Sequence, residues 1–159
     1  MIVFGIDPGT HITGYGVILK ERERLSCLDY GEIKIGRGEP LTHCLGILYD
    51  RILSLVQKVK PQALALEDIF YGRNVKSLIK QGHARGAIML VSSHTGIPLF
   101  EYTPLEVKKA TVGYGRAEKQ QVQHMVKVLL GLPSLPPTDA ADALAISICH
   151  ANFLKSVPS

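Results

Sequence analysis

The stretch Met1-Ile-Val-Phe-Gly-Ile-Asp-Pro-Gly-Thr10 decides the fold, because it places an acid where a buried strand ends. Residues 2–6 are an apolar run with the length of one buried strand. Pro8 has no backbone N–H and Gly9 tolerates positive φ, so the pair predicts a turn directly after Asp7. The carboxylate of Asp7 either caps its own turn or belongs to a charged site, and this stretch alone does not distinguish the two.

Length and composition predict one soluble domain, covering 1–155, with a frayed tail at 156–159. The chain has 159 residues, of which 46% are hydrophobic and 20% are charged. No apolar run is long enough to span a membrane, and no signal peptide precedes the first strand. The three cysteines, Cys27, Cys44 and Cys149, form no CxxC pair, so neither a disulfide framework nor a zinc site is expected. These features favour a cytoplasmic protein.

Strand and helix patterns downstream predict an α/β fold. Short connections join the first three strands and predict antiparallel pairing, whereas a helix precedes the fourth and predicts that it lies parallel to the first. We therefore expect a mixed five-stranded sheet, with three antiparallel N-terminal strands and then parallel strands, flanked by helices. The expected strands cover 2–6, 13–19, 25–35, 63–67 and 98–102, and the expected helices cover about 41–59, 74–94, 103–112, 117–130 and 138–154. The residues expected to cap helices are Asn74, Thr103 and either Thr138 or Asp139.

Acids from separate elements converge in this arrangement. Glu67 ends the fourth strand as Asp7 ends the first, and parallel strands bring their carboxyl ends to one edge, where open α/β sheets place their sites. Asp139 and Asp142 lie three apart in an otherwise apolar helix and so share one face. Asp139 could instead be a cap or a partner of the helix dipole. Asp142 is harder to explain in that way, because an acid inside so apolar a helix needs a compensating partner.

Four carboxylates together repel one another, and no lysine or arginine lies adjacent in sequence to neutralise them. Their natural counterions are Mg²⁺ or Mn²⁺, which prefer oxygen ligands. Two such ions, held ~3.5–4 Å apart, bind a phosphodiester and activate water for in-line attack. Asp68 follows Glu67 in the strand and points to the opposite face, so we do not expect it to be a primary ligand.

A basic segment follows these strands. The net charge of +4 is modest, but no acid lies between Asp68 and Glu101. Phosphate binding needs such an unbalanced segment, although a solvated helix face has the same pattern. The basic residues of this segment that could hold DNA are Arg73, Lys76, Lys80 and Arg85.

Several motifs, in this order, resemble one family. They are Gly5-Ile-Asp-Pro-Gly-Thr10, Gly14-Tyr-Gly16, Glu67, Gly82-His-Ala-Arg-Gly86, Ala117-Glu-Lys-Gln-Gln-Val-Gln-His-Met125 and Asp139-Ala-Ala-Asp-Ala-Leu-Ala145. The chain resembles the RNase H-like (retroviral integrase) superfamily and, within it, the bacterial crossover junction endodeoxyribonucleases of the RuvC family. The resemblance implies a homodimer in the bacterial cytoplasm that binds four-way Holliday junctions. It also implies symmetric nicks in two opposing strands, 5′-phosphate and 3′-hydroxyl ends, and contact with the RuvA–RuvB branch-migration complex.

The resemblance also assigns roles to individual residues. It implies a catalytic, metal-binding tetrad whose members are Asp7, Glu67, Asp139 and Asp142. It makes Phe70 a wedge that stacks on an unpaired base, with Tyr71 assisting, where the residues alone favour a hydrophobic plug at the edge of the core. Lys108 and Lys119 match lysines near the scissile phosphate, where the residues alone indicate solvated helix lysines. Finally, it implies that the helix carrying Gly82 and Gly86 packs against its dimer mate.

Three other functions are compatible with part of the pattern. An actin-like phosphate-binding ATPase or sugar kinase also begins with a strand and Asp-x-Gly-Thr, but that architecture needs two such domains and a longer chain. A non-catalytic junction-binding module has no need for four acids in the core. An RNase H-like nuclease acting on RNA is not excluded by the residue physics, although the motifs favour DNA.

Overall fold

A computed structural model of the chain describes residues 1–69 and 74–154 and contains one five-stranded sheet between two layers of helices. The strands lie in the order β3-β2-β1-β4-β5. Their bounds are β1 (Ile2–Asp7), β2 (Ile12–Glu21), β3 (Arg24–Lys34), β4 (Ala63–Glu67) and β5 (Leu99–Tyr102). The helices are α1 (Leu41–Val59), α2 (Val75–Thr95), α3 (Pro104–Val112), α4 (Lys119–Leu130) and α5 (Thr138–Phe153).

The predicted mixture of strand directions is confirmed. β1 pairs antiparallel with β2, and β2 pairs antiparallel with β3. β4 pairs parallel with β1 on the other side, and β5 pairs parallel with β4. β1 is therefore the central strand, so its carboxyl end lies in the middle of one edge of the sheet.

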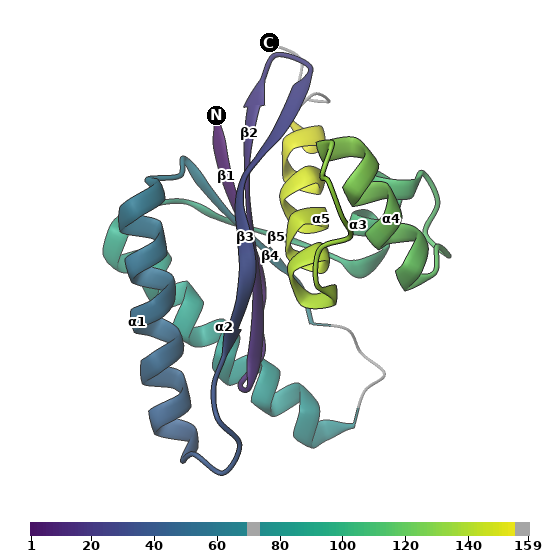
Figure 1. The fold of residues 1–159 in the computed structure, drawn as a ribbon. Coiled ribbons are helices and arrows are strands. Elements are labelled where there is room, and N and C mark those ends of the chain that lie inside the picture. The colour runs from purple at the N-terminus through teal and green to yellow at the C-terminus, as the bar shows by residue number, and fades with distance from the viewer. Residues whose placement is uncertain (70–73, 155–159) are drawn as a thin grey trace.

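Alternation along each strand divides the core between the two faces of the sheet. Phe4 and Ile6 of β1 are buried in a cluster with Leu48 and Ile52 of α1. Val3 is buried in a second cluster that is built mainly on α3, α4 and α5. Figure 1 shows the sheet edge-on, with α1 and α2 on one side and α3, α4 and α5 on the other. Asp7 has the same strand parity as Val3 and so faces the α5 side.

α5 packs very closely on the sheet, because many of its buried residues are alanines with small side chains. Eleven of its residues are buried, including Ala140, Ala141 and Ala143. A Cβ placed on Gly5 of β1 would overlap the α5 backbone, so only glycine permits this approach. The helix therefore brings its acids down onto the end of β1.

The observed N-caps of the helices agree with the predicted caps for α2 and α3 and differ for α5. The Asn74 side chain accepts from the Ser77 N–H at 2.9 Å, and Thr103 forms the predicted capping box with Glu106. The prediction that Thr138 or Asp139 caps the last helix is wrong, because α5 begins at Thr138 and Pro137 is its N-cap. Pro sets an extended backbone before the helix without a side-chain cap, which leaves Asp139 in the first turn with its carboxylate available to the site.

Candidate active site

Three acids lie in one row across the sheet, on the face that α5 covers. Asp7 of β1 pairs with Gly14 of β2, and Gly14 pairs with Glu32 of β3. On the other side of β1 the register aligns Ile6 with Leu66, so the next position places Glu67 beside Asp7. Because directly paired residues project to the same face, the side chains of Glu32, Asp7 and Glu67 share the α5 side.

The first turn of α5 adds two carboxylates to this row. One carboxylate oxygen from each of Asp7, Asp139 and Asp142 lies within 4.8 Å of the others. Glu67 lies outside this group among the described residues, although its charge helps to raise the pKa of Asp7. The predicted convergence thus brings three aspartates into direct proximity, with Glu67 at the flank.

The electrostatics of the site favour neutral carboxyl groups when no cation is bound. Burial, and then the charges of Asp142, Glu67 and Asp139, raise the pKa of Asp7 well above its usual value of 3.8. Burial also raises the pKa of Asp142, although Lys119 acts in the opposite direction. An arrangement that resists its own ionisation calls for positive charge from another source.

Part of that charge comes from Lys119 at the start of α4. Its Nζ lies 3.1 Å from Oδ2 of Asp142. Partial burial acts to lower the pKa of Lys119, but Asp142, Asp7 and Asp139 raise it, and the net shift is upward. The sequence shows no basic residue adjacent to the acids, but folding brings Lys119 to Asp142 from a helix that is distant in the sequence, so part of the negative charge is neutralised within the chain.

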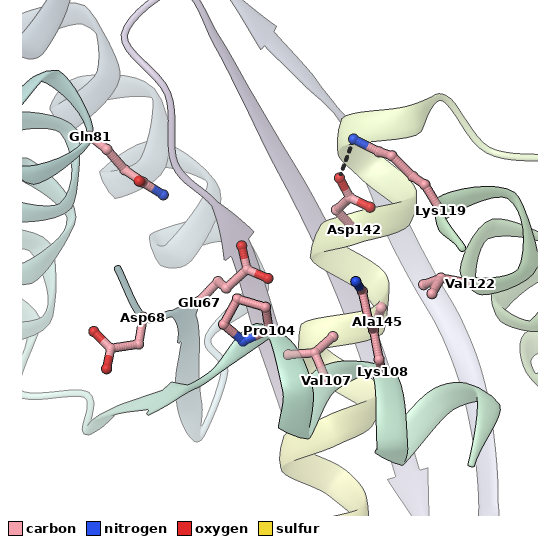
Figure 2. A pocket seen from close by; sticks show the side chains of 10 residues that line it. All are labelled: Glu67, Asp68, Gln81, Pro104, Val107, Lys108, Lys119, Val122, Asp142 and Ala145. Atoms are coloured by element: carbon pink, nitrogen blue, oxygen red, sulfur yellow. Dashed lines mark ion pairs between the residues drawn. The ribbon is translucent and has the colours of Figure 1, made fainter. Parts of the chain in front are cut away.

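A cavity of about 300 Å³ opens beside the acids. Figure 2 shows Glu67 at the end of β4 and Asp142 on α5, with Lys108 of α3 and Lys119 of α4 on the same side of the cavity. Gln81 of α2 lines the opposite wall. Carboxylates and lysines both line the cavity, so an anionic substrate with bound cations would find both charges matched there.

Arg85 does not lie where the sequence predicts. The residue is 5% exposed, and its guanidinium donates to the backbone carbonyl of Glu67 and to Oε1 of Glu101. Its Nη2 also lies 3.7 Å from Oδ1 of Asp68. The prediction that Arg85 contacts a DNA arm is therefore corrected, because its donors are used inside the chain, where they fix the end of β4.

The remaining predicted DNA contacts fall into two groups. Lys76 and Lys80 are exposed near the start of α2, as a phosphate contact requires. Phe70, Tyr71 and Arg73 lie outside the described residues. Asp68 pairs with Arg85 and also lines the cavity beside Glu67, so the expectation that it is not a primary ligand stays a prediction.

Sequence reasoning missed Glu32, whose side chain is 14% exposed. Burial, the charge of Glu32 and a side-chain hydrogen bond with Glu32 all raise the pKa of Asp139. Strand alternation carries a signal for this placement, since Glu32 has the parity of Tyr30, which packs against the α5 cluster. Which face of the sheet Glu32 occupies depends on how β3 pairs with β2, however, and that pairing cannot be read from the sequence of β3 alone.

The three aspartates fit a divalent cation by chemistry and by position. Carboxylate oxygens are the ligands that Mg²⁺ and Mn²⁺ prefer, and no softer ligand lies among the three. The site lies near the carboxyl ends of the parallel strands, where its side chains are held by buried elements. Over residues 1–69 and 74–154, no helix combines the length and hydrophobicity that crossing a membrane requires.

Comparisons with known proteins agree with this geometry. A family model described as crossover junction endodeoxyribonuclease RuvC matches residues 3–150. The chain is 48% identical over 153 residues to the protein of that name from Ruminiclostridium cellulolyticum, covering 96% of this chain and 92% of that protein. It is 47% identical over 150 residues to the one from Magnetococcus marinus, covering 94% and 83%.

Solved structures give the same result. The structure of Thermus thermophilus RuvC is similar with a TM-score of 0.89 and 35% identity, covering 98% of this chain and 96% of that one. The same protein in complex with a Holliday junction substrate has a TM-score of 0.91 and 36% identity, covering 98% and 95%. The yeast mitochondrial resolvase Ydc2, at 13% identity and a TM-score of 0.69, shares the fold. With its mixed sheet, its aspartate cluster and these matches over nearly its whole length, the chain belongs to the RuvC family of crossover junction endodeoxyribonucleases.

Proposed function

We propose that this chain is a metal-dependent endodeoxyribonuclease that resolves four-way Holliday junctions in DNA recombination and repair. It cuts two opposing strands symmetrically and leaves 5′-phosphate and 3′-hydroxyl ends. The observation that carries the proposal is the group of Asp7, Asp139 and Asp142 within 4.8 Å, in a chain that belongs to the RuvC family. The activity resides in one RNase H-like domain, residues 1–155, acting in the bacterial cytoplasm.

We assign each carboxylate a role from its position in the fold. Asp7 on the central strand, Glu67 and Asp142 would hold Mg²⁺, two ions to a site, and Mn²⁺ would substitute. Asp139 completes the site or orients the attacking water. When bound, such ions stabilise the charge on the phosphate and lower the pKa of the attacking water. The flank position of Glu67, outside the aspartate group, is compatible with its serving a different ion from Asp142.

Lysine and arginine side chains would bind the phosphate groups of the DNA. Lys108 and Lys119 border the cavity beside the acids and would contact the scissile phosphate. The side chain of Lys119 is 63% exposed although it pairs with Asp142, so it can reach both the site and a bound strand. Lys76 and Lys80 are exposed near the start of α2 and would hold a DNA arm. For the three residues outside the described ranges, we propose that Phe70 stacks on an unpaired base, assisted by Tyr71, and that Arg73 contacts phosphate.

A homodimer would give two such sites. Val75, Ile79 and Leu90 of α2 are 70%, 54% and 52% exposed, which is unusual for large apolar side chains on one helix. A Cβ at Gly82 or Gly86 would meet no neighbouring atom, so this face of α2 is open to a second helix. We propose that α2 pairs with its two-fold mate and places two identical sites on a symmetric junction. The RuvA–RuvB complex is a further proposed partner.

The activity is tested with a synthetic four-way junction in the presence of Mg²⁺. We expect paired symmetric nicks, little cleavage of linear duplex and no cleavage with chelator. Asp7→Asn should abolish cleavage and leave junction binding intact, whereas Asp50→Asn, on the exposed surface of α1, should change neither. Cleavage by the Asp7→Asn variant at the parent rate would refute the assignment of the site. Phe70→Ala should impair cleavage more than binding, and an equal loss of both would return Phe70 to a structural role.

The dimer is tested by sedimentation of the free protein. Ile79→Lys should shift the chain toward monomer, because the substitution puts a charge into the proposed apolar contact. Val128→Lys changes a side chain of similar exposure, 59%, on α4 and serves as the matched control. Unchanged sedimentation of the Ile79→Lys variant as a dimer would place the interface elsewhere.

A further inference from the structure

The backbone carbonyl of Glu67 points toward the end of β1. The N–H of Asp68 donates to the carbonyl of Tyr102 at 2.8 Å, so this peptide group turns its N–H toward β5. In a trans peptide, as this one is, the carbonyl points the opposite way. The carbonyl of Glu67 is therefore directed at the neighbour on the other side, which is β1.

Pro8 removes the donor that β1 would supply to this carbonyl. The register of β1 and β4, continued by one position, places Asp7 opposite Glu67. The carbonyl of Ile2 accepts from the N–H of Gln62 at 3.0 Å, so the even-numbered backbone groups of β1 face β4. In such a parallel ladder, the carbonyl of Glu67 would accept from the residue after Asp7. That residue is Pro8, which has no N–H, and the ladder ends there.

Arg85 of α2 supplies a donor in its place. Its Nη1 donates to the carbonyl of Glu67, and its Nη2 donates to Oε1 of Glu101 on β5. The same Nη2 lies 3.7 Å from Oδ1 of Asp68. Arg85 is 5% exposed, so its planar guanidinium is held in one orientation by burial and by these three partners.

We infer that Arg85 is a positioning residue, which fixes the backbone of Glu67 and thereby keeps the Glu67 carboxylate beside Asp7, where the cation binds. It acts from outside the site: α2 lies on the face of the sheet opposite α5, and Arg85 is not among the described residues that line the cavity. The Pro8 turn ends the ladder directly after Asp7, and Arg85 restores the lost hydrogen bond without covering the acids. This inference rests on the proposed metal site.

Two other roles for Arg85 lead to different expectations. If Arg85 acted on a cation only through its charge, its removal would strengthen cation binding, because a nearby positive charge repels a cation. If Arg85 only stabilised the fold, any variant of similar instability would have the same effect on binding. A positioning role instead requires that loss of the donor weakens cation binding while the protein is still folded.

The test measures Mn²⁺ affinity by electron paramagnetic resonance on the full chain without DNA. Partners of metal ligands typically change metal affinity by about 10–100-fold when they are removed, so we expect about a 10-fold loss for Arg85→Met. Leu48→Ala is the matched control, because it opens a cavity in the buried core on the same side of the sheet and leaves Glu67 untouched. It should leave the affinity unchanged. Thermal unfolding verifies that each variant is folded at the temperature of the measurement.

A variant that keeps the charge tests the geometry alone. Arg85→Lys retains the positive charge but lacks the planar fork that reaches Glu67 and Glu101 together, so it should also bind Mn²⁺ more weakly than the parent. Pro8→Ala returns a backbone N–H opposite the carbonyl of Glu67. When it is added to Arg85→Met, it should recover part of the lost affinity.

Hydrogen exchange of the metal-free protein reports the backbone without any cation. The N–H of Asp68 belongs to the same peptide group as the carbonyl of Glu67, so release of that carbonyl should loosen its bond to Tyr102. We expect this N–H to exchange faster in Arg85→Met than in Leu48→Ala. Equal exchange in the two variants would overturn the inference.

A Glu67→Gln background identifies the route of the effect. If Arg85 acts through Glu67, adding Arg85→Met to that background should cost no further Mn²⁺ affinity. A loss of the same size in that background, or an equal loss in Leu48→Ala, would overturn the inference. Unchanged or tighter binding by either Arg85 variant would overturn it too, as would failure of Pro8→Ala to recover any affinity. Absence of Mn²⁺ binding to the parent chain would overturn the proposed metal site and this inference with it.

Discussion

Replacing Asp7 by Asn should stabilise the metal-free protein while it removes the activity. The Asp7 carboxylate is half-buried and lies within 4.8 Å of two other carboxylates, so its ionisation opposes folding when no cation is bound. Asparagine has nearly the same shape and carries no charge. The substitution therefore relieves the repulsion without leaving a cavity.

The size of the effect follows from the separation of the carboxylates. Two unit charges 4.8 Å apart repel by about 3.5 kcal/mol at an effective dielectric constant of about 20 and by about 0.9 kcal/mol in water. Lys119 offsets part of this repulsion, and the raised pKa of Asp7 reduces the fraction of the group that is ionised at a given pH. We expect Asp7→Asn to raise the free energy of unfolding by about 1–2 kcal/mol, or the Tm by about 2–8 °C for a chain of this size.

The effect should depend on pH with a definite sign. The folded-state pKa of Asp7 lies above 3.8, so its contribution to stability is present below that pH and is lost as pH rises through the folded-state pKa. The Tm difference between Asp7→Asn and the parent should therefore be small near pH 4 and grow toward pH 8. Saturating Mg²⁺ should raise the Tm of the parent and so reduce the difference.

Calorimetry with chelator present checks this prediction. Asp50→Asn is the control, because Asp50 is exposed on α1 and its replacement should change the free energy of unfolding by less than about 0.5 kcal/mol. An Asp7→Asn variant that is no more stable than the parent at pH 8 without metal would refute the reasoning, since the carboxylates would then not repel. A gain that is the same at pH 4 and pH 8 would show that the cause is packing and not charge.

Three further predictions follow from the contacts around the site. Lys119→Met should destabilise the metal-free protein by about 1 kcal/mol, because Asp142 loses its partner, and saturating Mg²⁺ should abolish the difference in thermal unfolding. Arg85→Met should cost about 3 kcal/mol in urea unfolding, the low end for a broken buried pair since the Glu101 side chain is 39% exposed; a cost under about 1 kcal/mol would contradict the anchoring role. Thr103→Ala should cost about 1 kcal/mol through loss of the α3 capping box, and an unchanged urea midpoint would show that the box does not contribute.

Much of the fold can be predicted from local sequence, because the patterns that start, continue and end helices and strands extend over only a few residues. The predicted helix 41–59 and strand 63–67 agree with α1 and β4, since apolar residues at helical spacing and a proline soon after the helix, Pro61, act within a few residues. Helix ends were less well predicted: Ala117 precedes α4, because Glu118 forms a capping box with Gln121 and starts the helix at Lys119. Such details depend on which of several competent polar residues makes the cap.

Arg85 shows why surface contacts could not be predicted from the sequence. A run of basic residues without acids looks like one exposed face, but the helix turns Arg85 toward the sheet, where Glu101 lies 16 positions away. Lys76 and Lys80, on the same helix, remain exposed. Helical periodicity gives the faces of α2, and only its packing against the sheet decides which of them is buried.

The sequence by itself determined where the acids stand along the chain. Asp7 ends an apolar strand at a Pro8-Gly9 turn, Glu67 ends another, and Asp142 interrupts an apolar helix, because strand ends and helix faces follow from neighbours a few residues away. The tertiary structure decided which charges meet. Strand register put Glu32 in the row of Asp7, and helix packing brought Lys119 to Asp142. Those contacts join residues that are far apart in the chain. Burial and electrostatic interactions depend on the distance between groups in space and not on their separation along the sequence.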